Sequence, residues 1–98
     1  MPKPVIWSPL SEIDIGNILD YVEKNWGNKV VLSFIDLIEN QINQISTNPK
    51  QFPIIYKRKR VRKCVLTKHN TLYYRESKYY VEILRIYDTR QDPSTLTF

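Results

Sequence analysis

Residues 81–87 read Val-Glu-Ile-Leu-Arg-Ile-Tyr, and apolar side chains occupy both alternating faces of this stretch apart from Glu82 and Arg85. A continuous run of β-branched and aromatic residues is typical of a strand that is covered on both faces. We therefore predict a central strand at about Tyr79–Tyr87, against which the rest of the chain is arranged.

Two further strands are predicted before it, at about Val61–Thr67 and Thr71–Glu76. The segments between the three strands are the short turns 68–70 and 77–78. Connections of two or three residues join antiparallel neighbours. The second half of the chain therefore predicts a three-stranded antiparallel meander.

The first half of the chain predicts a short strand at Val5–Trp7 and two amphipathic helices separated by Gly27. Ser8 or Ser11 can cap the first helix, with Asp14 in the capping-box position after Ser11. Apolar side chains recur at helical spacing in both helices: Leu10, Ile15, Leu19, Val22 and Trp26, then Val31, Phe34, Ile35, Ile38, Ile42 and Ile45. Because two such stripes cannot bury each other completely, we predict an α+β fold in which an antiparallel helical hairpin packs on an antiparallel sheet.

Six of the seven residues from Lys57 to Lys63 are basic, and the net charge of +5 comes entirely from them. Such a run is most often a solvated face, and at the entrance to a strand it can also bind an anion or an acidic protein segment. Any affinity for nucleic acid would be largely independent of sequence and would fall steeply with salt. We call these residues the basic block and treat them as candidates for binding: Lys57, Arg58, Lys59, Arg60, Arg62 and Lys63.

The length of 98 residues predicts one domain that spans residues 1–98. A single cysteine, Cys64, excludes an intramolecular disulfide and a cysteine-based zinc cluster, which fits a reducing cytoplasm. Cys64 is predicted to be a small buried side chain and not a nucleophile. A signal peptide and a membrane span are both missing from the sequence pattern, so we expect a cytoplasmic protein without membrane contact, cofactor or metal.

Two kinds of side chain could carry chemistry near the meander. Histidine is a common general acid or base, but the place of His69, the only histidine, in the predicted turn 68–70 favours a solvated side chain. Most tyrosines are expected to pack between strands. The exception is Tyr87, which lies near Arg85 and Arg90 at the end of the last strand and is kept as a candidate catalytic residue. Arg85 is a candidate binding residue, or else the partner of Glu82 or Glu76.

The order of strand, helix, helix and meander in 98 residues resembles the RelE/ParE superfamily, the toxins of bacterial type II toxin–antitoxin (plasmid stabilisation) modules. Three segments carry the resemblance: Ile6–Ser11, Asn48–Pro53 and Val81–Pro93. The resemblance implies a small toxin that is held inactive by an antitoxin. Within the superfamily, the RelE branch cleaves mRNA on the ribosome, whereas the ParE branch poisons DNA gyrase.

The resemblance also implies roles for single residues. Arg62 falls on a lysine position of the RelE branch, and Arg90 falls on its arginine after the last strand. Cys64 and Thr71 depart from the basic residues expected at their positions, and the tail after Pro93 lacks a tyrosine. Since arginine is a poor base at neutral pH, two arginines can stabilise charge but cannot complete the proton transfers of RNA cleavage.

The sequence therefore favours a ParE-like toxin that acts on DNA gyrase and whose antitoxin binds the basic block through an acidic segment. A RelE-like mRNA endoribonuclease and an inactive binding module remain as alternatives. We expect Arg62 and Arg90 to be exposed, so that replacing both with alanine abolishes toxicity and preserves the fold.

Overall fold

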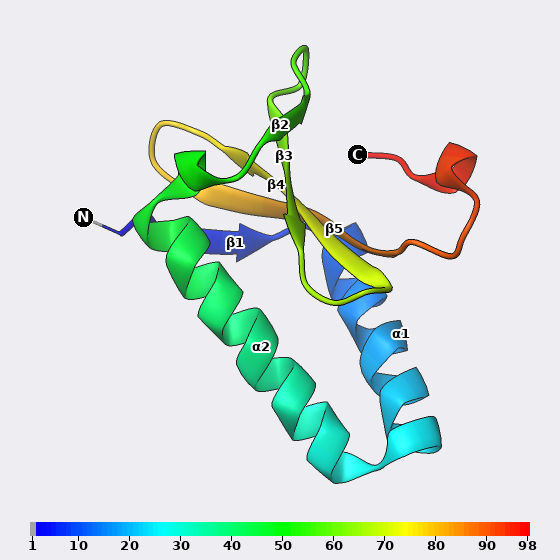
Figure 1. The fold of residues 1–98 in the computed structure, drawn as a ribbon. Helices are drawn as coiled ribbons and strands as arrows, with labels where there is room; N and C mark the ends of the chain where they lie inside the picture. The colour runs from blue at the N-terminus through cyan, green and yellow to red at the C-terminus, as the bar shows by residue number, and fades with distance from the viewer. Residues whose placement is uncertain (1) are drawn as a thin grey trace.

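The computed structural model describes residues 2–98, which form two helices, five strands and two short 3₁₀ helices (Figure 1). The elements follow one another as β1 (Val5–Trp7), α1 (Pro9–Trp26), α2 (Asn28–Thr47), η1 (Pro49–Gln51), β2 (Ile54–Tyr56), β3 (Val61–Val65), β4 (Asn70–Glu76), β5 (Val81–Asp88) and η2 (Pro93–Thr95).

The strands form one sheet in the order β1-β5-β4-β3-β2. Strands β3, β4 and β5 pair antiparallel, which confirms the predicted meander and the α+β class. β1 pairs with β5 in parallel, from Val5 opposite Val81 to Trp7 opposite Ile83, so the sheet is mixed. The parallel pairing arises because the helical hairpin carries the chain from the β1 edge to the far edge, and the meander then returns to β1.

The apolar side chains on both parities of β5 come from a bulge. Tyr73 pairs with Arg85 and Tyr74 pairs with Ile83, so Leu84 is an additional residue on β5. A bulge of this kind reverses the alternation of side chains along its strand. As a result Ile83 and Ile86 both join the core beneath the helices, while Arg85 and Tyr87 lie on the opposite face.

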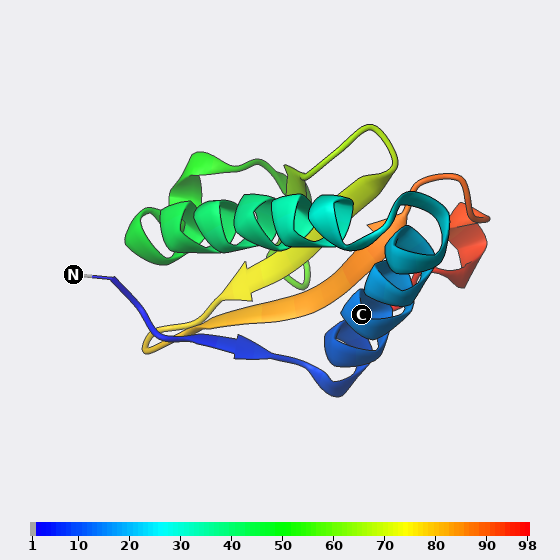
Figure 2. The same cartoon turned by 90° about the horizontal axis from the view of Figure 1, so that it is seen from below.

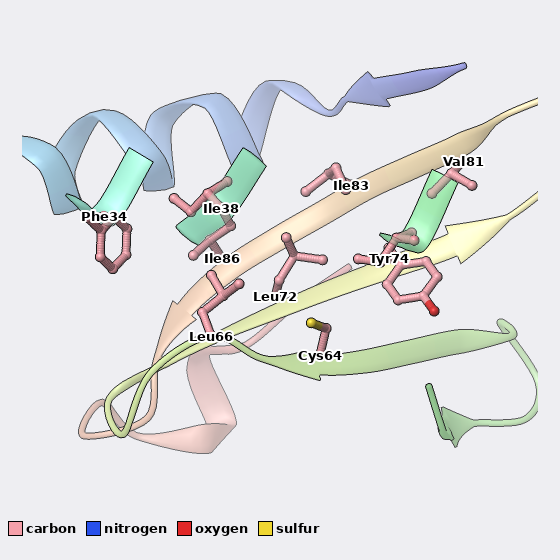
Figure 3. Close-up of a cluster of buried hydrophobic side chains, with 10 residues drawn as sticks. Phe34, Ile38, Cys64, Leu66, Leu72, Tyr74, Val81, Ile83 and Ile86 are labelled. Atoms are coloured by element: carbon pink, nitrogen blue, oxygen red, sulfur yellow. The ribbon is translucent and has the colours of Figure 1, made fainter. Parts of the chain in front are cut away.

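One continuous core joins α2 to the inner face of the sheet (Figure 3). It contains Phe34, Ile38 and Ile45 from α2, with side chains of β3, β4 and β5 beneath them: Cys64, Leu72, Tyr74, Val81, Ile83 and Ile86. The connection between the helices extends past the sheet (Figures 1 and 2), and Trp26 is 63% exposed there. Leu10 is also exposed, so the predicted apolar stripe of α1 is buried only in part.

Ser8 lies between β1 and α1, and it extends the hydrogen bonding of β1 with β5 by one residue. The Ser8 amide donates to Ile83 O at 2.9 Å, and Ser8 Oγ donates to Leu84 O at 2.8 Å while it accepts from the Ser11 amide. Ser8 is therefore the helix cap. Asp14 is not used in a capping box, because its Oδ2 accepts from the amide of Ile86 at 3.1 Å.

The basic block leads into strand β3, as the sequence suggested, and its first four residues form the turn of a hairpin that was not predicted. Strand β2 precedes it and pairs antiparallel with β3. The turn between them, residues 57–60, projects from the edge of the sheet (Figure 1). Arg60 is the residue that closes this turn, with a positive φ of 57°.

Candidate functional site

The basic block presents its charge to solvent. Lys57, Arg58, Lys59 and Arg60 lie in the hairpin turn, and Lys63 lies on β3; all five side chains are exposed. None of these five forms an ion pair with another described residue, since the four ion pairs of residues 2–98 all lie elsewhere. The hairpin therefore carries uncompensated positive charge at one edge of the sheet.

Arg62 differs from its neighbours in the block because it points to the helix-facing side of the sheet. It pairs with Tyr74, which belongs to the core. Its Nη1 donates to Phe52 O at 2.6 Å and to Lys50 O at 3.3 Å. The expectation that Arg62 is exposed was wrong: the side chain is half-buried and ties the 48–53 loop to β3.

Tyr87 lies on the opposite face of the sheet and is 6% exposed. Its hydroxyl donates to Asp92 O at 2.9 Å and is also hydrogen-bonded with Thr95 Oγ1. The guanidinium of Arg85 lies 5.6 Å from the centre of its ring. These contacts fix the C-terminal segment against the sheet, and they leave the hydroxyl covered.

Arg90 is exposed in the loop after β5, as expected. Its Nε and Nη2 donate to the two carboxylate oxygens of Asp88 at 3.0 and 2.7 Å. These hydrogen bonds from Arg90 hold the pKa of Asp88 below its usual value. Arg90 is therefore held by a local pair at the end of the strand.

The three candidate catalytic residues do not come together. Arg62 stands at the level of Tyr74 on β4, whereas Arg90 follows Asp88, which pairs with Asn70. Four residues of β4 separate the two levels, or about 13 Å. Arg62 and Tyr87 also lie on opposite faces of the sheet. The structure therefore does not bring the three side chains together at one point, and their catalytic role stays a prediction.

The other side chains that could take part in catalysis are Cys64, His69 and possible metal ligands. Burial raises the pKa of the Cys64 thiol to about 11, so the side chain stays protonated, and its Sγ lies 3.6 Å from Gln41 Oε1. His69 lies in the loop between β3 and β4, as expected. Among residues 2–98 no group of three His, Cys, Asp or Glu side chains is arranged to hold a metal.

The partner of Arg85 is neither Glu82 nor Glu76. Nε and Nη2 of Arg85 donate to both oxygens of Asp14 at 2.8 and 3.1 Å, and Nη1 donates to Thr97 O at 3.1 Å. The hydrogen bonds that Arg85 donates to Asp14 raise the pKa of Arg85. Glu82 pairs instead with Arg75, and Glu76 pairs with Lys3. Arg85 thus joins α1, β5 and the C-terminal segment.

A cavity that the sequence did not reveal lies between the two helices. It has a volume of about 580 Å³ and is lined mainly by apolar side chains, with two carboxylates: Trp7, Glu12, Ile15, Ile35, Ile38, Glu39, Ile42 and Asn43. The two arms of the helical hairpin diverge from their connection (Figure 1), and the cavity lies between them. Within residues 2–98 no helix is long and apolar enough to cross a membrane.

The contrast between the two arginines gives a first prediction. Replacing Arg62 with alanine leaves the Lys50 and Phe52 carbonyls without their donor and should lower the free energy of unfolding by about 1–2 kcal/mol. Replacing Arg90 with alanine breaks only a local, exposed pair and should leave the thermal midpoint unchanged. Thermal unfolding of the two variants checks this. Equal midpoints for Arg62→Ala and the unmodified chain would show that the loop does not depend on Arg62.

Comparison with known proteins gives the family. A family model described as "ParE toxin of type II toxin-antitoxin system, parDE" matches residues 5–93. No curated protein sequence matches the chain. Among solved structures, the fold is similar to the "Chromosomal ParDE TA system from P. aeruginosa", with a TM-score of 0.74 and 19% identity over 88% of this chain and 95% of that one.

Two further structures share the fold. The "YoeB/ParE toxin from Agrobacterium tumefaciens" has a TM-score of 0.62 and 12% identity over 87% of this chain and 96% of that one. A chain of the E. coli DinJ-YafQ toxin-antitoxin complex has a TM-score of 0.63 and 10% identity over 92% and 96%. Identities this low establish the fold, whereas the family rests on the sequence match over residues 5–93. The chain belongs to the ParE toxin family of type II toxin–antitoxin systems.

Proposed function

We propose that this ParE-family chain is a cytoplasmic toxin that acts on DNA gyrase and that a cognate antitoxin neutralises it. The observation that carries the proposal is the match of residues 5–93 to the ParE toxin family. The choice of DNA gyrase as the target rests on the placement of Arg62, Tyr87 and Arg90.

Cleaving RNA without a metal requires a base, an acid and cations around one phosphorus atom. Here Arg62 is engaged with backbone carbonyls, Tyr87 has a covered hydroxyl, and Arg90 lies at the far end of the sheet. A toxin that acts by binding does not need these groups to converge. The separation therefore supports gyrase over mRNA as the target.

An antitoxin partner is proposed from the two complexes among the structural relatives, which are described as a ParDE system and a DinJ-YafQ toxin–antitoxin complex. The cavity between α1 and α2 offers this partner an apolar docking site with Glu12 and Glu39 on its lining. Lys57, Arg58, Lys59 and Lys63 of the basic block, whose side chains are exposed, remain the proposed site for an acidic segment of the same partner. Four strand spacings separate β1 from β2, or about 19 Å, which an extended segment can span.

The target is tested with purified components. We expect the chain to inhibit supercoiling by DNA gyrase and to leave mRNA intact in a reconstituted translation reaction, and we expect its antitoxin to reverse the inhibition. Undiminished supercoiling together with mRNA cleavage on the ribosome would favour the RelE-like alternative. Unimpaired growth of a host that expresses the chain without antitoxin would indicate an inactive binding module.

A further inference from the structure

Four cations that are far apart in the sequence line one small cavity beside the hairpin. The cavity has a volume of about 250 Å³, and its lining is entirely polar: Lys3, Lys50, Arg60, Glu76, Ser77 and Lys78. These residues come from the segment before β1, from η1, from the hairpin turn, from the end of β4 and from the turn after it. The fold thus gathers positive charge at a place that lies outside the interhelical cavity and away from Tyr87 and Arg90.

The one carboxylate of this cavity is already neutralised. Lys3 Nζ donates to Glu76 Oε2 at 2.7 Å and to Ser77 O at 2.7 Å. Lys50, Arg60 and Lys78 have no ion-pair partner among residues 2–98. The hydrogen bond from Lys3 holds the pKa of Glu76 below its usual value, and the charges of Lys50 and Arg62 lower it further. The field inside the cavity is therefore positive and favours an anion.

The backbone at Arg60 supports a binding role for its side chain. Among residues 2–98, Arg60 is the only non-glycine residue with a positive φ, which is 57°. Glycine or asparagine adopts this conformation at lower cost, whereas an arginine there costs of order 1 kcal/mol. Strain of this kind is found at sites where the side chain has a function. Here the side chain lines the cavity.

We propose that this cavity is a phosphate-binding pocket that holds one backbone phosphate of a nucleic acid, with Lys50, Arg60 and Lys78 as its ligands. Lysine binds phosphate as a point charge, and a tetrahedral oxyanion accepts from donors that converge from several directions. The volume is below the range of pockets that enclose a whole small molecule, which fits a single phosphate group. Because no apolar side chain lines the cavity, it offers nothing to the hydrophobic side chains of a protein partner.

The pocket predicts a specific loss of nucleic-acid binding. In the full chain, Lys50→Gln with Lys78→Gln should weaken binding of a labelled single-stranded oligonucleotide about 10-fold and reduce the slope of log K against log salt by about 0.7–1. The matched control is Lys24→Gln with Lys29→Gln, which removes the same charge from the helical hairpin and should change the affinity less than about 2-fold. Fluorescence anisotropy measures both. Equal losses in the two double variants would overturn the pocket, because the effect would then be one of overall charge.

A second variant separates binding from folding. Arg60→Asn removes a cation and places a residue that tolerates positive φ in the turn, so the thermal midpoint should not fall although oligonucleotide binding weakens. Unchanged binding in Arg60→Asn would remove this residue from the pocket.

The source of the phosphate is tested with small anions. Inorganic phosphate should shift the backbone amide NMR signals of Ser77 and Lys78 and should compete with the oligonucleotide. If phosphate shifts these signals while oligonucleotide affinity is the same in Lys50→Gln with Lys78→Gln, the pocket serves a free phosphate. Binding of a polyglutamate peptide in the same place, without any response to phosphate, would overturn the proposal in favour of an acidic protein segment. These readouts do not depend on toxicity, so they stand whether or not gyrase is the target.

Discussion

Replacing Arg85 with alanine is expected to lower the free energy of unfolding by about 3 kcal/mol, because it leaves a largely covered carboxylate without its partner. The side chains of Arg85 and Asp14 are only 12% and 14% exposed. Loss of Arg85 removes two hydrogen bonds to Asp14, the hydrogen bond to Thr97 O and the contact with the Tyr87 ring. The helix, the central strand and the C-terminal segment lose their common connection in one step.

The same sheet face provides the control. Arg75 pairs with Glu82 at 3.0 Å, but their side chains are 42% and 25% exposed. Arg75→Ala should therefore cost less than about 1 kcal/mol. Chemical denaturation at neutral pH measures both variants. Arg85→Lys should fall between them, since lysine keeps the charge but cannot form the two parallel hydrogen bonds.

A double-mutant cycle with Asp14→Asn isolates the pair. Asparagine keeps an oxygen that can accept from the Ile86 amide, so its main effect is the loss of charge. A coupling energy near zero between Arg85→Ala and Asp14→Asn, or a loss below about 1 kcal/mol for Arg85→Ala, would show that Arg85 is free for the binding role expected from the sequence.

The parts of the fold that the sequence predicted correctly are those set by local patterns. Helix α1 ends at Trp26, just before Gly27, and α2 ends at Thr47, just before the loop with Pro49 and Pro53, so both boundaries follow from local residues. The meander is visible because each of its turns is short. Even so, Asp14 could not be assigned from sequence. Its spacing from Ser11 fits a capping box, whereas its partners, Arg85 and Ile86, lie 71 and 72 residues away.

The errors arise where the backbone departs from regular geometry. A tight hairpin is normally recognised in a sequence by glycine or asparagine at the positions with positive φ. The turn before β3 has Arg60 at such a position instead, so β2 was not predicted. The apolar run of residues 81–87 correctly indicated a strand that is covered on both faces, but the bulge at Leu84 could not be read from it. The exposure of Arg62 was also predicted wrongly, because the face of the sheet on which Arg62 lies depends on its pairing with Tyr74.

Antitoxin binding is expected to depend more on the cavity between the helices than on the basic block, the two docking surfaces proposed above. Ile35 lines the cavity between the helices and is half-buried. Leu32 lies one turn earlier on α2, is 63% exposed and is not part of the cavity lining. The two residues therefore form a matched pair: the same charge can be placed on one helix, inside the cavity or outside it.

Ile35→Asp is expected to weaken antitoxin binding by at least about 100-fold, because it puts an unpaired charge into an apolar contact next to Glu39. Leu32→Asp should change the affinity less than about 3-fold. Calorimetric titration of the purified toxin with its antitoxin measures both, with circular dichroism to confirm that the fold is kept. In cells, Ile35→Asp should arrest growth even when the antitoxin is present, since the antitoxin no longer binds the toxin.

The salt dependence of antitoxin binding shows whether the cavity or the basic block contributes most of the affinity. An interface dominated by apolar burial responds weakly to ionic strength, whereas one built on the exposed charges of residues 57–63 loses affinity steeply between low and moderate salt. If Ile35→Asp binds the antitoxin as tightly as the unmodified toxin and the salt dependence is steep, the basic block is the docking surface. In that case Lys57→Glu with Lys59→Glu should abolish binding instead, because the hairpin tip would then repel an acidic segment.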